Sequence, residues 1–93
     1  MSGIHVFRAW RLVFRRANDP GARCRIDGGF SPVSGGIVYL HETDARRVAA
    51  QKTAQSAAEV KASYEYDVAP IGIIVSGQYA WALGEPVLVQ LTQ

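Results

Sequence analysis

The stretch PIGIIVSGQYAWALGEPVLVQL (70–91) decides the fold class of this chain. It holds three short apolar runs, which are separated by SGQ (76–78) and GEP (84–86). The runs are rich in β-branched and aromatic residues, which favour strands, and the separators contain the glycine and proline that favour turns. Short strands joined by such turns are typical of a small β-barrel or β-sandwich.

One long segment upstream of this stretch has a different character. Residues 44–62 are rich in alanine and contain neither glycine nor proline, so they predict a helix, with Thr43 or Asp44 as its N-cap. Its apolar stripe is made of small residues, among them Ala49, Thr53 and Ala57, so the helix should depend on its neighbours. The fold class predicted is therefore mainly β with one Ala-rich helix, a small barrel or sandwich, with α+β as the alternative. Shorter strands are expected at 36–41 and 64–68.

The segment IHVFRAWRLVFRR (4–16) supports two interpretations. Read with a helical period, Arg8, Arg11 and Arg15 lie on one side, as in an amphipathic basic helix. Read with a period of two, it is a half-buried strand. The turn signal NDPG (18–21) follows, and residues 22–27 then read as a short return strand, so we expect a hairpin.

The chain of 93 residues predicts a single domain. Within it, GGFSPVSGG (28–36) separates an Arg-rich N-terminal hairpin or arm, residues 1–34, from a β-rich body, residues 35–93. An apolar content of 48% with 19% charged residues excludes a disordered chain and suggests that part of the apolar surface meets a partner or another copy. No apolar run is long enough for a membrane span, and we expect a soluble protein that stays in the cell or in a particle assembled there.

The charge is small overall but unevenly placed. Residues 1–30 hold six arginines against two aspartates, whereas residues 31–93 carry a net charge of −2. Guanidinium groups suit carboxylates and phosphates, so the first part of the chain is a candidate binding edge for an acidic protein surface or for nucleic acid.

Candidate catalytic and metal-binding groups are few. HETD (41–44) lacks the second histidine of a zinc motif, and Cys24 has no evident base partner. Glu65 and Asp67 would share one face of a strand, without a cleft to desolvate them. One cysteine and two histidines cannot form a disulfide or a Cys/His zinc site. We therefore expect a protein that is not an enzyme and needs no cofactor or metal.

Three motifs carry a resemblance to a known class: GGIVYL (35–40), PIGIIV (70–75) and AWALGEPVLVQ (80–90). In this order, around an alanine-rich middle, they resemble small virion structural proteins of tailed bacteriophages, above all capsid decoration (cement) proteins. The resemblance implies a small β-rich protein that assembles in the host cytoplasm and stabilises the head from its outer surface. The implied partners are the major capsid protein, or another virion protein, and further copies of the chain, with a trimer favoured.

Under this hypothesis a group of N-terminal residues should contact the partner: Arg8, Trp10, Arg11, Arg15 and Arg16. Two alternatives remain open. Aromatic residues between the arginines also suit a small basic nucleic-acid-binding module, and a small phage protein could instead be a host-directed inhibitor or adaptor.

Overall fold

The computed structural model describes residues 5–27, 34–58, 63–83 and 88–92. These residues form one helix and six strands: β1 (His5–Arg16), β2 (Arg25–Ile26), β3 (Ser34–Tyr39), α1 (Glu42–Ala57), β4 (Tyr64–Ser76), β5 (Tyr79–Ala82) and β6 (Leu88–Thr92). The expected loop at 28–33, the end of the expected helix at 59–62 and the expected turn at 84–86 lie outside the described residues. No helix among the described residues is both long and apolar enough to cross a membrane.

Five of the strands form a closed barrel. Their order is β1-β3-β6-β5-β4, and β4 pairs with β1 to close the ring. The β3–β6 pair is parallel and the other pairs are antiparallel. This arrangement confirms the predicted small β-barrel with one helix.

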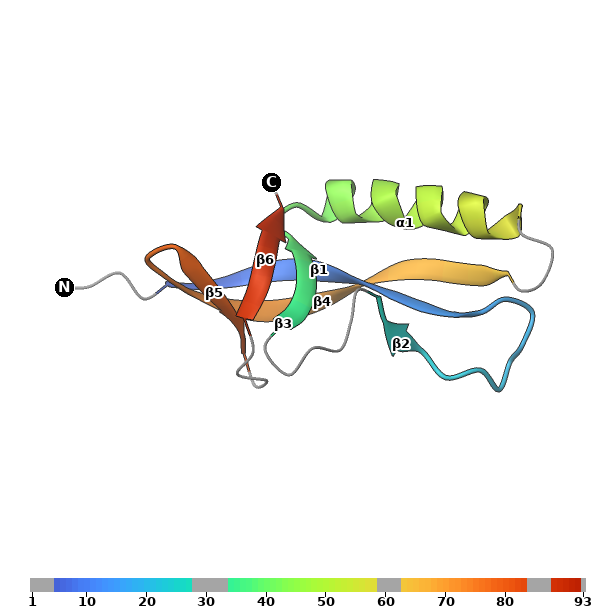
Figure 1. Cartoon of the computed structure of the whole chain (residues 1–93), viewed down its shortest axis with the longest axis horizontal. Coiled ribbons are helices and arrows are strands. Elements are labelled where there is room, and N and C mark those ends of the chain that lie inside the picture. The colour runs from blue at the N-terminus through green and yellow to red at the C-terminus, as the bar shows by residue number, and fades with distance from the viewer. Residues whose placement is uncertain (1–4, 28–33, 59–62, 84–87, 93) are drawn as a thin grey trace.

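The two longest strands extend well beyond the barrel. β1 and β4 pair without interruption from His5↔Val75 to Arg16↔Tyr64. The pairs from His5↔Val75 to Trp10↔Pro70 belong to the barrel, and residues 11–16 of β1 and 64–69 of β4 continue beyond it as an extension, here called the ribbon. The helix α1 lies along the ribbon, and the molecule is elongated, with extents of 53 × 26 × 18 Å (Figure 1).

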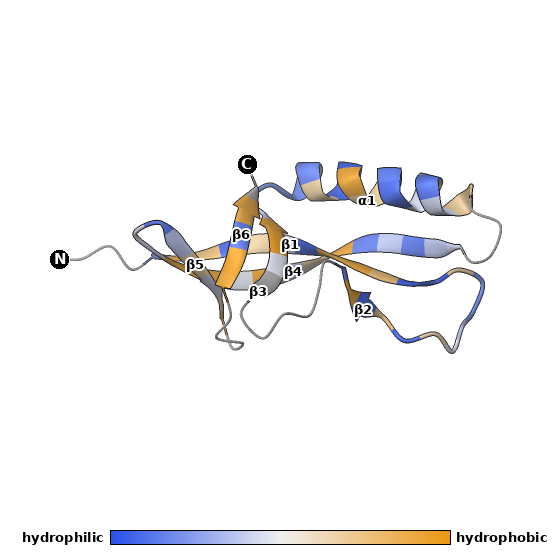
Figure 2. Cartoon of the chain, viewed as in Figure 1, coloured by the Kyte–Doolittle hydropathy of each residue, from blue (hydrophilic) through white to orange (hydrophobic). Residues whose placement is uncertain are grey.

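The barrel has a narrow core. Its buried members are mostly small: Ala9, Val38, Ile73, Ala80, Ala82 and Val89. A five-stranded ring leaves little interior space, so alanine and valine fill it where larger side chains would not fit. Apolar residues gather on β3, β6 and part of β1, whereas α1 and the ribbon part of β4 are mainly hydrophilic (Figure 2).

A second core lies between α1 and the ribbon. Leu12, Tyr39, Ala45 and Ala49 are buried there, and Trp10, Val48, Tyr66 and Val68 pack against them. Small side chains let the helix approach the strands closely, as the sequence predicted for Ala49. The expectation for Ala57 was wrong: it is exposed, and Ser56 is buried instead, because the helical face turned toward β4 contains position 56.

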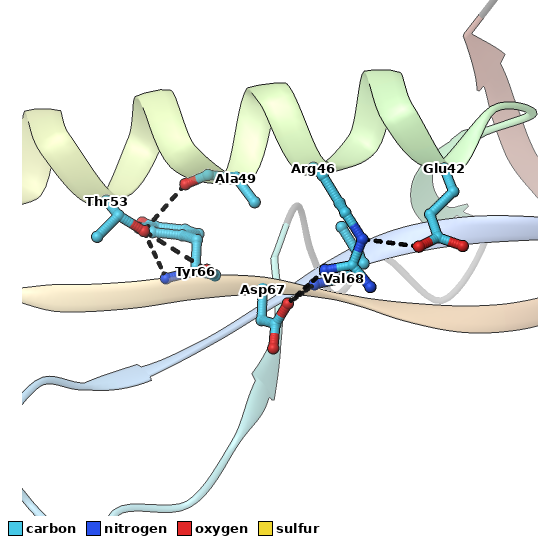
Figure 3. A network of polar contacts seen from close by, with 7 residues as sticks. All are labelled: Glu42, Arg46, Ala49, Thr53, Tyr66, Asp67 and Val68. Carbon is cyan, nitrogen blue, oxygen red and sulfur yellow. Dashed lines mark hydrogen bonds and ion pairs between the residues drawn. The ribbon is translucent and has the colours of Figure 1, made fainter.

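Hydroxyl groups of α1 cover the free edge of β4. The backbone N–H of Tyr66 donates to Thr53 Oγ1 at 2.9 Å, and the N–H of Tyr64 donates to Ser56 Oγ at 2.7 Å. Thr53 also donates to the carbonyl of Ala49, so its hydroxyl joins helix and strand (Figure 3). An open strand edge invites pairing with other chains, and the helix protects this one.

In the segment that supported two interpretations, the described residues 5–16 form a strand, because β4 offers a long pairing partner. The return strand is much shorter than predicted, since only residues 25–26 pair with β1. Arg23 and Cys24 are exposed and offer no apolar face that would hold a longer pairing in place.

The strands expected at 64–68 and 70–75 are one strand that runs through Pro70. The N–H groups of Tyr64 and Tyr66 point to α1, away from β1, and strand alternation gives position 70 the same direction. The N–H that proline lacks would therefore face away from β1, before the pairing with β5 begins at Ile73. A ladder position without a partner tolerates proline.

The expected N-cap was wrong. The helix begins at Glu42, and His41 is the N-cap residue, whose side chain makes no capping hydrogen bond. The carbonyl of His41 accepts from the N–H groups of Asp44 and Ala45 at 3.1 and 3.2 Å. Glu42 and Asp44 lie in the first turn, where carboxylates interact favourably with the helix dipole.

Candidate functional site

The structure separates the five residues that the sequence singled out. Arg8 is exposed on the outside of the barrel, opposite Gly72, whereas Arg15 and Arg16 are exposed at the far end of the ribbon. A strand advances about 3.3 Å per residue, so positions 8 and 16 lie about 26 Å apart. A helix would have brought Arg8, Arg11 and Arg15 onto one face, but the strand distributes them along the molecule.

Trp10 and Arg11 lie between these two ends. Trp10 is half-buried and packs against the core beneath α1, so packing alone accounts for a large aromatic side chain at this position. Arg11 is also half-buried. Neither residue lies at the end of the ribbon, where the other basic residues gather.

At that end four arginines surround one concavity of about 270 Å³, here called the arginine hollow. It is formed where β1 turns back through residues 17–24. Its lining consists of Phe14, Arg15, Arg16, Asp19, Ala22, Arg23, Arg25 and Tyr64.

The turn at residues 18–21 brings the two pairs of arginines together. Asn18 adopts a φ of 60°, the N–H of Gly21 donates to Asp19 Oδ1 at 3.0 Å, and the N–H of Ala22 donates to the Asp19 carbonyl at 3.0 Å. Asparagine tolerates this left-handed conformation better than most residues. The chain then returns so that Arg25 pairs with Phe14 across the β1–β2 ladder.

Aromatic rings form the base of the hollow. Phe14 stacks on Tyr66, with 5.5 Å between ring centroids, and meets Tyr64 edge to face at 5.6 Å. Such pairs fix ring positions beyond what area burial supplies. The arginines therefore extend from a rigid aromatic base.

The positive charge of the hollow is incompletely balanced. Arg15 lies 3.7 Å from Glu65, and both side chains are about half exposed. Among the described residues, Arg16, Arg23 and Arg25 form no ion pair. Four guanidinium groups thus share two nearby carboxylates, Asp19 and Glu65, and the hollow has a positive field suited to an anionic partner.

The sequence pointed to arginines in this part of the chain but did not select Arg23 and Arg25. Both belong to the six arginines of residues 1–30, and the predicted turn at 18–21 could have placed them beside residues 14–16. The sequence does not show that Phe14 pairs with Arg25, because this pairing depends on the register of the hairpin.

Ion pairs on the surface of α1 and the ribbon include three carboxylates that were candidate site groups in the sequence: Glu42, Asp44 and Asp67. Arg46 donates to Glu42 at 2.7 Å and lies 3.6 Å from Asp67, and the hydrogen bond that Glu42 accepts raises the pKa of Arg46 (Figure 3). Arg47 lies 2.5 Å from Asp44. In the part of the chain that is described, no group of three His, Cys, Asp or Glu residues lies close enough to hold a metal ion.

One partly buried connection holds the hairpin to the helix. Lys52 on α1 donates to Asp27 Oδ2 at 2.5 Å, and its ammonium group lies 5.7 Å from the centroid of the Tyr66 ring. The hydrogen bond that Lys52 donates to the Asp27 carboxylate raises the pKa of Lys52. The N–H of Asp27 donates to the carbonyl of Leu12, so Asp27 is held to β1 through its backbone and to α1 through its side chain.

Comparisons of this chain with protein-family models, with curated proteins and with solved structures found no match.

Proposed function

We propose that this chain is a structural protein of a tailed-bacteriophage virion, a head decoration or capsid-stabilising protein that binds an acidic surface of the major capsid protein. The observation that carries the proposal is the arginine hollow, where Arg16, Arg23 and Arg25 have no ion-pair partner among the described residues. The motifs at 35–40, 70–75 and 80–90 support the assignment to this class of virion proteins.

The hollow suits carboxylates on a protein surface. A guanidinium group offers parallel N–H donors that match a carboxylate, and pairs of this kind are the strongest of the charge-assisted hydrogen bonds. A single exposed pair contributes about 0–1 kcal/mol, so one molecule would bind weakly. A shell presents the same site many times, and several linked contacts give high occupancy without high affinity at any one of them.

The proposal is tested by neutralising the unpaired arginines. The variant R23Q/R25Q removes two positive charges from the hollow, and both side chains are exposed, so the fold should be retained. The control Q51E/Q55E lowers the net charge by the same amount at exposed positions of α1. Co-sedimentation with phage heads lacking the protein, followed by electron microscopy, measures occupancy.

We expect R23Q/R25Q to lower occupancy at least tenfold and Q51E/Q55E to leave it close to that of the unmodified protein. Heads that carry no added density with the unmodified protein would overturn the proposal. Equal losses in the two variants would show that net charge matters and the hollow does not.

A second candidate is a single-stranded nucleic acid, favoured by the two aromatic residues, Phe14 and Tyr64, that line the hollow beside the arginines. Basic grooves with stacking platforms bind single strands in this way. Filter binding of a labelled oligonucleotide at several salt concentrations separates the two candidates. Tight binding at low salt that falls steeply as salt rises, together with bare heads, would favour nucleic acid.

A further inference from the structure

The large apolar side chains that the fold leaves exposed gather in the barrel part of the molecule. Among the described residues they are Val6, Phe7, Ile37, Tyr79, Leu83 and Leu88. Each belongs to a barrel strand or directly follows one, and no residue of α1 or of the ribbon is among them. A cluster of this kind on a small protein marks an interaction surface more often than isolated exposed residues do.

Part of this cluster forms one continuous surface on four neighbouring strands. The ladders pair Val6 with Ile74, Ile74 with Trp81 and Trp81 with Leu88, so these side chains lie in a row across β1, β4, β5 and β6. The row is on the outside, because Ile73 and Ala80 on the alternate positions are buried.

Two further residues extend the row. The Tyr79 ring lies 6.0 Å from the ring of Trp81. The N–H of Leu83 donates to the Gly72 carbonyl at 2.9 Å, and its side chain lies over Gly72, where a Cβ atom would be only 3.1 Å from it. We call this surface the barrel face; it comprises Val6, Ile74, Tyr79, Trp81, Leu83 and Leu88.

The barrel face is almost free of charge. Among the outward-pointing described residues of β1, β4 and β5 in the barrel, only Arg8 is charged, and it lies beside Val6 at the border. An acidic partner of the kind that suits the arginine hollow would find almost no positive charge on this face. An identical face does match, because two uncharged apolar surfaces can meet without repulsion between like charges.

We propose that the barrel face binds a second copy of this chain. A twofold axis through the face would bring identical apolar surfaces together, which is the commonest symmetry of homo-oligomers. Copies cannot meet through their arginine hollows, because four guanidinium groups on each would repel. The hollow lies at the ribbon end of a molecule 53 Å long, so pairing through the barrels separates the two hollows far beyond the Debye length of about 8 Å.

The size of the face sets the strength of the contact. Four strands at about 4.8 Å spacing and about 20 Å of strand length give roughly 400 Å² on each copy. A stable dimer needs about 800 Å² from each partner, so we expect weak, concentration-dependent association. A weak dimer would still present two arginine hollows to one partner, which raises avidity in a symmetrical assembly.

Sedimentation velocity of the purified full chain tests this inference, over a concentration range from about 10 μM to about 1 mM. We expect the sedimentation coefficient to rise with concentration toward that of a dimer, and the rise to persist in about 1 M salt, because salt screens charges and does not weaken apolar contacts. The single variants V6K and Y79K should each weaken association at least tenfold. Both residues are more than half exposed, at 64% and 53%, so thermal melting should show that the fold is retained.

The matched control is A57K, which adds a lysine at an exposed position of α1, outside the barrel face. It should associate like the unmodified chain. A monomer at the highest concentration would overturn the inference, and so would equal weakening by A57K. The variant R23Q/R25Q should associate normally while losing occupancy on phage heads, so the two proposals can fail independently.

Discussion

The barrel and the ribbon are built from the same two strands, yet they are stabilised in different ways. In the barrel, β1 and β4 belong to a closed ring around buried Ile73 and Val38. In the ribbon the same strands have left the ring, and α1 supplies the cover, through small side chains and hydroxyl groups such as that of Thr53. A closed ring pairs every strand edge with another of its strands, whereas the ribbon depends on α1 at the edge of β4 and on β2 at the edge of β1.

The surfaces of the two regions differ as well. The barrel exposes apolar side chains and the ribbon end exposes arginines. Because partly protected elements open more easily than closed cores, we expect the ribbon to have the lower local stability. One pair of long strands therefore carries a closed barrel at one end and a cluster of exposed arginines at the other.

The largest effect is expected in the barrel core. Replacing Ile73, which is fully buried, by alanine should lower the free energy of unfolding by about 3 kcal/mol, because the narrow core cannot collapse around the cavity. Urea unfolding followed by circular dichroism measures the loss. The neighbouring change I74A, on the half-buried outer face, should cost less than half as much. Equal losses would contradict the view that the barrel interior dominates stability.

A smaller and local effect is expected where α1 covers the ribbon. Replacing Thr53 by valine removes the acceptor of the Tyr66 N–H, which should cost about 1–2 kcal/mol. Hydrogen exchange should accelerate at the Tyr66 amide and hardly at all at Ile73 in the barrel. The matched control is T43V at an exposed position in the first turn of α1. If barrel amides accelerate as much as ribbon amides, the two regions unfold as one unit and the distinction fails.

Much of this fold could be predicted from local chemistry. The glycine turn at 76–78 and the apolar runs around it produce β4 and β5 where they were expected, and the alanine-rich segment is helical. The extent of β4 could not be predicted, because Pro70 normally interrupts a strand and is tolerated here only through the position of the free edge. The hydrogen bonds of Thr53 and Ser56 to β4 could not be predicted either, because they depend on a tertiary contact that the spacing of apolar residues does not indicate.

The candidate site was predictable only in part. Arg15 and Arg16 lie at the arginine hollow, but Arg8 and Trp10 do not, because a choice between strand and helix decides which arginines are neighbours. The sequence contained the basic bias and the turn. It did not contain the register of the hairpin, which sets the position of Arg25 and which a short strand specifies weakly.

An intermediate effect should appear at the contact between hairpin and helix. Replacing Lys52 by methionine removes its bond to Asp27 and should lower the free energy of unfolding by about 1 kcal/mol near neutral pH. The raised pKa of Lys52 means that the folded chain holds this proton more tightly than the unfolded chain. The contribution is therefore complete below the ordinary lysine pKa of about 10.4 and is lost as pH rises through the raised value.

The measurement is the difference in unfolding free energy between the unmodified chain and K52M across alkaline pH. It should be constant up to about pH 10 and then shrink. The control is R47M, which breaks the exposed ion pair with Asp44, and its difference should stay constant because a guanidinium group does not titrate in this range. A K52M difference that does not shrink would show that packing of the lysine chain, and not its charge, joins the two elements.

The smallest effect is expected at the arginine hollow, and its sign is informative. Arg25 is exposed, lies among three other arginines and forms no ion pair with the described residues, so R25Q should raise the free energy of unfolding by about 0.3 kcal/mol at low salt. Added salt should remove the gain, because it screens the repulsion that the variant relieves. The control R46Q should instead lower stability, because Arg46 lies against Glu42 and Asp67. If R25Q is destabilising at low salt, the hollow is electrostatically satisfied within the fold and lacks the unbalanced charge on which its binding role depends.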